Sequence, residues 1–180
     1  FTLPLWVAKK GGWENGQTVN LFENFVKKVA SEFAPFVDFW VTINEPGVYV
    51  YETYVSREWP GAKKSLLGQI KTTLNLANAH RRVYKFLNTN FTHIPIGIAN
   101  NIQSFEPYHK HSISEQFAVS LSDFVANHLF YFLTSGTHDF LGINYYFHTR
   151  FKHTEGVIPK VASATEFSHD ISMLGIKETR

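Results

Sequence analysis

The chain has 180 residues, of which 44% are hydrophobic and 16% aromatic, which is enough apolar material for one sizeable core. A formal net charge of +2 without any basic stripe argues against partners such as nucleic acid or a membrane surface. The absence of cysteine excludes disulfides and thiol catalysis, and no apolar run approaches the roughly 20 residues that span a bilayer. No signal peptide is visible, so we expect a cytoplasmic location.

Hydrophobic periodicity predicts strands that alternate with helices along the chain. The expected strands are the end of one at residues 1–5 and three short apolar runs at 36–44, 93–100 and 139–147. The expected helices have apolar residues at helical spacing and cover 18–33, 66–87 and 114–133. On the second of these helices, Leu67, Ile70, Leu74, Ala77, Tyr84 and Leu87 follow one face. Residues from Thr154 onward are polar and weakly periodic, which predicts a loop or a poorly ordered tail at 154–180.

Strands separated by single helices imply right-handed crossovers and a parallel sheet, so we expect an α/β fold. Such folds place their chemistry at the carboxyl ends of the strands. Polar residues follow three of the predicted strands, namely Asn44 and Glu45, then Asn100 and Asn101, then Asn144, Tyr145 and Tyr146.

Glu45 is the strongest candidate for a catalytic group. It follows a buried strand that contains Trp40, and removal of a carboxyl group from water disfavours its charged form. A glutamic acid that holds its proton can give it to a leaving oxygen. Pro46 cannot extend the sheet and fixes the exit of the chain. On the three residues Asn-Glu-Pro alone, a solvated carboxylate in a strand-end turn explains the pattern equally well.

A longer set of motifs favours the catalytic interpretation. The segments GGWEN at 11–15, FWVTINEPGVYV at 39–50, NLANAHRR at 75–82, IGIANN at 96–101 and DFLGINYY at 139–146 occur in this order. As a set they resemble glycoside hydrolase family 1, the β-glucosidases and β-galactosidases, over nearly all of residues 1–151. The resemblance implies a retaining β-glycosidase that acts on β-D-glucosides or related β-glycosides, built on a (β/α)8 TIM barrel and needing no metal or organic cofactor.

The resemblance also implies roles for individual residues. Glu45 matches the family's general acid/base, and Asn44 matches the asparagine that holds the 2-hydroxyl group of the sugar. Asn144 matches an asparagine close to the acid/base glutamate, and Tyr146 matches the tyrosine that hydrogen-bonds the nucleophile. Without the resemblance, Tyr146 is better explained as a packing residue. His80 lies on a predicted helix and is better explained as a structural histidine than as a ligand.

Retaining glycosidases need a second carboxylate about 5 Å from the first. In the resembling family it lies in an Ile-Thr-Glu-Asn-Gly segment, and this sequence contains no such segment. We therefore expect a fragment, with residues 1–153 forming the central part of a barrel and contributing about four of its eight parallel strands. We expect the fragment alone to be inactive. A chain that supplies the complementary half-barrel is a possible partner.

Three alternatives stay open at the level of sequence. One is another barrel glycosidase whose fourth strand ends in Asn-Glu-Pro, such as a cellulase, although GGWEN and GINYY argue against it. The second is a non-catalytic carbohydrate-binding or assembly half-barrel, and the third is the inactive product of a broken gene.

Overall fold

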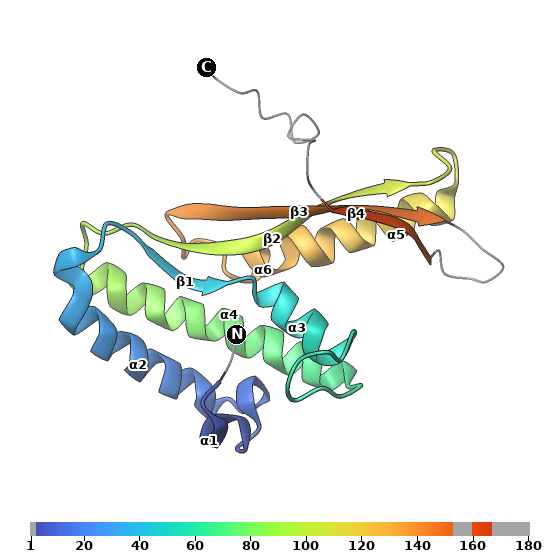
Figure 1. The fold of residues 1–180 in the computed structure, drawn as a ribbon. Helices are drawn as coiled ribbons and strands as arrows, with labels where there is room; N and C mark the ends of the chain where they lie inside the picture. The colour runs from blue at the N-terminus through green and yellow to red at the C-terminus, as the bar shows by residue number, and fades with distance from the viewer. Residues whose placement is uncertain (1–2, 153–159, 167–180) are drawn as a thin grey trace. The chain divides into compact units, whose positions relative to one another are not determined.

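The computed structural model describes residues 3–152 and 160–166, and these form two compact units (Figure 1). The first unit comprises Phe1–Asn101 and His128–Asn144, and the second comprises Ile102–Asn127 and Tyr145–Arg180. Each unit is described by itself.

The first unit contains most of the helices. In chain order its elements are α1 (Leu5–Ala8), the 3-10 helix η1 (Gly12–Glu14), α2 (Gln17–Phe33), the 3-10 helix η2 (Ala34–Phe36), β1 (Trp40–Asn44), α3 (Pro46–Tyr54), α4 (Leu66–Asn90) and α6 (Leu129–Leu133). The second unit contains α5 (Ile113–Asp123) and β4 (Lys160–Glu166). Three elements contribute residues to both units, namely β2 (Ile96–Pro107), the π-helix η3 (Phe124–His128) and β3 (Phe140–Lys152).

The strands form one sheet in the order β1-β2-β3-β4. In the first unit β1 pairs with β2 in parallel, with Trp40 opposite Ile96 and, after a register shift, Asn44 opposite Ala99. The backbone N–H of Asp139, just before β3, donates to the carbonyl of Ile96 at 2.7 Å. In the second unit β3 and β4 pair in antiparallel fashion from Phe147–Glu166 to Lys152–Lys160.

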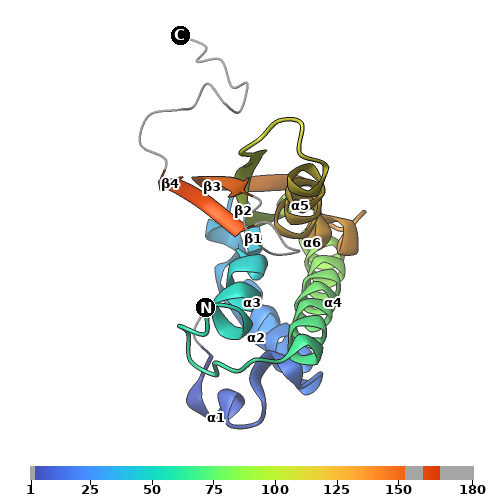
Figure 2. The ribbon, with the colours of Figure 1, turned by 90° about the vertical axis from the view of Figure 1, so that its right-hand side faces the viewer.

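The core of the first unit lies between the helices and the strands. Helix α4 packs against α2, α3 and β1, and Figure 2 shows it alongside α2 and α3. Two clusters of buried side chains fill this region, with Val19, Leu76, Ala79, Ile98 and Phe130 in one and Ala30, Val83, Leu87 and Ile96 in the other. Ile96 and Ile98 therefore point from β2 toward the helices, because alternate residues of a strand share a face.

The expected apolar face of α4 is partly wrong. Leu67, Ile70 and Leu74 are exposed. Ala77 and Leu87 are buried as expected, and the rest of the buried stripe consists of residues that were not predicted, namely Thr72, Leu76, Ala79, His80 and Val83. This stripe includes a threonine and a histidine that find hydrogen-bond partners inside the unit, so hydrophobicity alone did not identify it.

Other differences concern the type of element. Leu5 begins helix α1 where we expected the end of a strand, and Phe1 and Thr2 lie outside the described residues. Helix α3 was not predicted, because Asn-Glu-Pro-Gly is typical of a turn. The predicted helix at 114–133 is interrupted by the π-helix η3. Strand β4 lies where we expected a loop, and the remainder of 154–180 lies outside the described residues.

The expected fold class is confirmed in its main features. Strand β1 lies within its predicted run, whereas β2 and β3 begin within theirs and extend beyond them. Helices α2 and α4 cover the predicted ranges. Among residues 3–152 and 160–166, no helix is both long and apolar enough to cross a membrane.

Candidate active site

The turn between β1 and α3 presents the side chain of Glu45. Its backbone is in the left-handed region, with φ 50° and ψ 54°, which costs a residue other than glycine about 1–2 kcal/mol. The turn is held from both sides. The N–H of Glu45 donates to the carbonyl of Ala99 at 2.8 Å, and its own carbonyl accepts from Val48 and Tyr49 in the first turn of α3. Pro46 at the first helical position has no N–H that would need a partner.

The carboxyl group of Glu45 lies in a small polar cluster. Glu45 is 8% exposed, so most of it is removed from water. The Nδ2 atom of Asn144 donates to Oε1 of Glu45 at 2.8 Å and to Oδ1 of Asn44 at 3.0 Å. The structure therefore brings together three of the four residues that the sequence predicted for the site.

Asn144 reaches this cluster because β3 lies very close to β2. A Cβ atom added at Gly142 would lie 2.8 Å from Cβ of Ala99, which is closer than side chains approach one another. Only a glycine therefore fits at this position of β3 without moving the strand. Sequence reasoning missed Gly142, although a glycine inside an apolar strand signals a close approach of this kind.

His80 fixes the strand that leads to Glu45. Its Nε2 atom donates to the carbonyl of Thr137 at 2.5 Å, so Nδ1 is the acceptor for the hydroxyl of Thr42 on β1, at 2.6 Å. Burial lowers the pKa of His80 to about 4, even though the hydrogen bond to Thr137 opposes this shift. His80 is therefore neutral near pH 7 and structural, as the sequence indicated.

Helix α3 is anchored at its far end by Tyr54. The Tyr54 hydroxyl donates to Glu14 at 2.7 Å and lies 2.8 Å from the hydroxyl of Thr72 on α4. Burial raises the pKa of the Tyr54 hydroxyl, so it stays protonated. Burial also raises the pKa of Glu14, but hydrogen bonds from Lys63 and Tyr54 outweigh it and bring that pKa below its ordinary value. The helix that starts at Glu45 is thus tied to η1 and α4.

Tyr146, the fourth predicted residue, belongs to the second unit, where it lies on β3 with 45% of its surface exposed. Its predicted role toward the nucleophile therefore stays a prediction. Within the described ranges, no group of three or more histidine, aspartate or glutamate residues is arranged to hold a metal ion.

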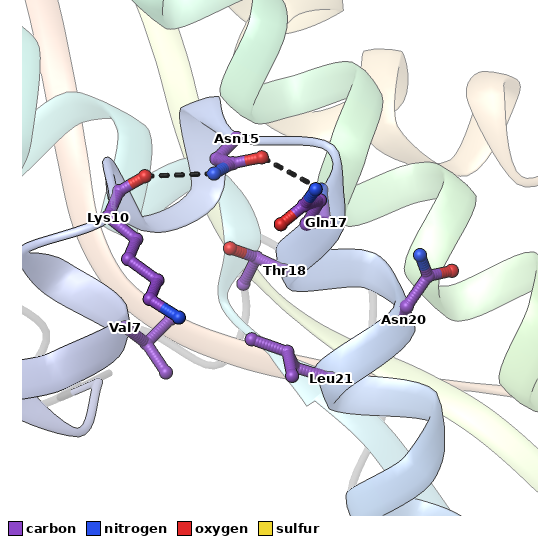
Figure 3. A pocket seen from close by; sticks show the side chains of 7 residues that line it. All are labelled: Val7, Lys10, Asn15, Gln17, Thr18, Asn20 and Leu21. Carbon is purple, nitrogen blue, oxygen red and sulfur yellow. Dashed lines mark hydrogen bonds between the residues drawn. The ribbon is translucent and has the colours of Figure 1, made fainter.

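A separate pocket lies in the first unit near the start of α2 (Figure 3). It has a volume of about 250 Å³ and is lined by Val7, Lys10, Asn15, Gln17, Thr18, Asn20 and Leu21. Figure 3 shows Asn15 joined to the carbonyl of Lys10 and to the backbone N–H of Gln17, bonds of 2.9 and 3.0 Å that shape the loop. None of these residues belongs to the Glu45 cluster.

Comparison with known proteins identifies the family of the chain. The family model for glycosyl hydrolase family 1 matches residues 1–134. The chain is 32% identical over 160 residues to the rice protein "Beta-glucosidase-like SFR2, chloroplastic", covering 81% of this chain and 24% of that protein. It is 31% identical over 159 residues to the Arabidopsis thaliana protein "Galactolipid galactosyltransferase SFR2, chloroplastic", covering 81% of this chain and 25% of that one.

Solved structures show the same relationship. The β-glycosidase from Pyrococcus horikoshii superposes with a TM-score of 0.81 and 28% identity, over 95% of this chain and 44% of that one. The family 1 β-glucosidase from Exiguobacterium antarcticum superposes with a TM-score of 0.80 over 89% of this chain and 44% of that one. The chain thus spans about a quarter of the length of the curated relatives and under half of these structures. It belongs to glycosyl hydrolase family 1, and its fold is part of the TIM barrel found in the β-glycosidases of that family.

Proposed function

We propose that this chain carries the general acid/base, Glu45, of a retaining β-glycosidase. The observation that carries the proposal is the hydrogen bond from Asn144 to a buried Glu45 carboxyl group that faces Asn44. A glutamate in an ordinary strand-end turn has no need of a strained backbone, a buried carboxyl and an amide donor from a strand 99 residues away.

The reaction has two steps. In the first, protonated Glu45 gives its proton to the glycosidic oxygen while the bond from that oxygen to the anomeric carbon breaks. A second carboxylate, about 5 Å away, forms a covalent bond to the same carbon. In the second step, ionised Glu45 takes a proton from a water molecule, whose oxygen displaces that carboxylate. The 180 residues contain no Ile-Thr-Glu-Asn-Gly segment, so the proposal requires the second carboxylate to come from outside them.

The hydrogen bonds assign the two oxygens of Glu45 to different tasks. Oε1 accepts the N–H of Asn144, and this hydrogen bond is strongest when Oε1 carries no proton, so it favours protonation of Oε2. Oε2 is then the oxygen that carries the proton to the leaving group. Oδ1 of Asn44 also accepts from Asn144, which orients the Asn44 amide so that its Nδ2 is the donor offered to the 2-hydroxyl group of the sugar.

The test uses the complete gene product that contains these residues, with Glu45→Gln as the variant. A 2,4-dinitrophenyl β-glycoside loses its leaving group without help from an acid, so its first step is fast without Glu45. The second step still lacks its base, and the glycosyl-enzyme accumulates. Azide is a nucleophile that needs no base, so it is expected to restore turnover and to give the β-glycosyl azide.

The control is Glu32→Gln, which removes an exposed carboxylate that pairs with Lys28 of the same helix. It is expected to leave turnover unchanged and to form no azide product. Full activity of Glu45→Gln on a poor leaving group such as an alkyl glycoside would exclude Glu45 as the acid/base. Loss of activity without rescue by azide would count against it as well.

A second candidate function is transfer of a sugar between lipids. It is favoured by the two relatives that align over 81% of this chain, one of which is named a galactolipid galactosyltransferase, whereas the Thermotoga 1,4-β-D-glucan glucohydrolase aligns over 58%. The same site serves this reaction if Glu45 deprotonates a sugar hydroxyl in place of water. Incubation with galactosyl diacylglycerol in detergent micelles distinguishes the two, because transfer yields a digalactosyl lipid and hydrolysis yields free galactose.

A further inference from the structure

Helix α5 and the π-helix η3 that continues it turn an apolar side outward. Five large apolar side chains at helical spacing are 44–84% exposed there, namely Ile113, Phe117, Leu121, Phe124 and Val125. These five residues are called the outer stripe. The other exposed residues between them, Gln116 and Ser120, carry no charge. A surface helix of a globular protein normally has the opposite arrangement, with its apolar side turned inward.

The inner side of α5 and η3 is held by polar groups of the second unit. Glu115 is fully buried, and its carboxyl group accepts from the backbone N–H of His109 at 2.6 Å and lies 2.9 Å from Nδ1 of the same residue. Asn127 is 5% exposed and exchanges two hydrogen bonds, of 2.7 and 2.9 Å, with the backbone of Gln103 on β2. Turning the outer stripe inward would break these bonds, so the stripe stays on the surface.

The outer sides of the two other long helices are different, because charged residues lie among their exposed apolar ones. These are Lys27, Lys28 and Glu32 on α2, and Lys71, Arg81, Arg82 and Lys85 on α4. The exposed positions between 113 and 125 include no aspartate, glutamate, lysine or arginine. Single exposed apolar side chains are ordinary on a surface that faces water, whereas a continuous uncharged stripe marks a surface that contacts something else.

The chemistry of the outer stripe fits a lipid surface. Phenylalanine, leucine and isoleucine on one side of a helix enter the boundary between lipid headgroups and acyl chains. Helices that bind anionic membranes carry lysine and arginine beside such side chains, and the outer stripe has neither, which favours lipids without net charge. The side chains that most often anchor a protein partner are tryptophan, tyrosine and arginine, and none of them occupies an exposed position between 113 and 125.

An uncharged lipid surface agrees with the second candidate function. A lipid with two acyl chains stays in its bilayer, so an enzyme that transfers a sugar between such lipids must work at the membrane surface. The headgroup of galactosyl diacylglycerol carries no charge. We propose that the outer stripe docks the protein on a membrane of uncharged glycolipids. The inference rests on the proposed function in its lipid form, because it supplies the surface from which that reaction takes its substrate.

The test is co-sedimentation of the complete gene product with vesicles of galactosyl diacylglycerol and phosphatidylcholine. The variant combines Phe117→Gln with Leu121→Gln, which removes two central side chains of the outer stripe. We expect the unmodified protein to bind equally well at low and high salt, because no ion pair takes part. The double variant should bind about 10- to 100-fold more weakly and keep its kcat/KM for soluble 4-nitrophenyl β-D-glucoside.

The matched control combines Leu67→Gln with Leu74→Gln on α4. These leucines are 61% and 51% exposed, close to the 69% and 53% of Phe117 and Leu121, and their loss should leave vesicle binding unchanged. Binding only to anionic phosphatidylglycerol vesicles, or an equal loss in both double variants, would overturn the proposal. A lower melting temperature of the Phe117 and Leu121 variant would also overturn it, since the stripe would then be covered by protein.

Two further outcomes are distinguished by the same proteins. A dimer in analytical ultracentrifugation that the Phe117 and Leu121 variant abolishes, without vesicle binding, would assign the outer stripe to a second copy of the chain and exclude a lipid surface. The vesicle assay needs no turnover, so Glu45→Gln should bind as the unmodified protein does. Failure of the proposed function is therefore separate, because it appears as retained activity in Glu45→Gln.

Discussion

The Nδ2 atom of Asn144 lies 2.8 Å from Oε1 of Glu45 and 3.0 Å from Oδ1 of Asn44, so one amide group orients both a carboxyl and a second amide. Replacement by leucine keeps the approximate volume and removes both bonds. We expect Asn144→Leu to lower kcat/KM about 10- to 100-fold for an alkyl glycoside, because the acid is no longer held toward the leaving oxygen. Steady-state kinetics of the complete gene product measures this.

Two comparisons make that prediction specific. A 2,4-dinitrophenyl glycoside needs no acid in its first step, so the single-turnover rate of that step should fall much less in Asn144→Leu. Asn88→Leu changes an exposed asparagine near the end of α4 and should leave both rates unaltered. An equal loss with both glycosides would mean that Asn144 acts by supporting the fold rather than by orienting Glu45.

The backbone of Glu45 gives a second prediction, about stability. At φ 50° a Cβ atom is unfavourable, so glycine should be preferred over alanine here. Both variants lose the same carboxyl group, and their difference therefore isolates the backbone. We expect the free energy of unfolding of Glu45→Gly, measured in urea, to be about 1–2 kcal/mol higher than that of Glu45→Ala.

The matched pair for this comparison is Val48→Gly and Val48→Ala, inside α3. In a helix alanine is favoured over glycine by about 1 kcal/mol, so the order should reverse. If alanine were also the more stable choice at position 45, the left-handed turn would not be the conformation of this residue.

The close contact between Ala99 and Gly142 gives a third prediction. A methyl group at position 142 would lie 2.8 Å from Cβ of Ala99 and 3.1 Å from its Cα, so Gly142→Ala must push β3 away from β2. We expect a loss of about 1–3 kcal/mol in the free energy of unfolding, together with reduced activity, because Asn144 is only two residues further along the strand.

The double variant Gly142→Ala with Ala99→Gly moves the methyl group from one strand to the other, and it should recover part of both losses. Gly47→Ala is the control, since its nearest neighbour would be Asn100 Oδ1 at an ordinary 3.8 Å. Full stability of Gly142→Ala alone would show that the two strands have room between them.

The sequence predicted the site better than it predicted the packing around it. Asn44, Glu45 and Asn144 follow apolar strands, and the ends of parallel strands meet at one edge, so a one-dimensional pattern was sufficient to bring them together. The bend at Glu45 was not predictable in this way. It depends on the carbonyl of Ala99, 54 residues away, which holds a conformation that local preference disfavours.

The buried face of helix α4 was predicted less well than the site. Leu67, Ile70 and Leu74 look like a core stripe, but Thr72 and His80 occupy the core because their polar atoms find partners there. Those partners, such as Tyr54 and Thr42, come from other elements. Periodicity within one helix carries no information about them, so the buried stripe could not be selected from the sequence alone.

A fourth prediction concerns pH and His80. The pKa of His80 is about 4 in the folded protein and 6.5 in its ordinary environment, so the unfolded chain binds a proton at a higher pH than the folded protein does. The contribution of neutral, buried His80 to the free energy of unfolding is fully present above pH 6.5 and is lost as pH falls from 6.5 toward 4. The difference of 2.5 pKa units corresponds to roughly 3 kcal/mol.

Urea unfolding at several pH values between 4 and 7 checks this sign. Glutamine at position 80 offers a donor and an acceptor but does not titrate. Between pH 7 and pH 4, the free energy of unfolding should therefore fall by roughly 3 kcal/mol less in His80→Gln than in the unmodified protein. Parallel pH curves for the two proteins would mean that His80 titrates alike in the folded and unfolded chain.

The last prediction concerns the 180 residues on their own. General acid catalysis by Glu45 removes only part of the barrier, because the anomeric carbon also needs a carboxylate on its other side. The sequence has no Ile-Thr-Glu-Asn-Gly segment. Its one Glu-Asn-Gly, at residues 14–16, includes the η1 residue Glu14, which is held by Lys63 and Tyr54. We therefore expect the purified 180-residue chain to release no 4-nitrophenol above background from 4-nitrophenyl β-D-glucoside. Turnover that disappears in Glu45→Gln would contradict this, and it would show that a nucleophile for the anomeric carbon is present within these residues.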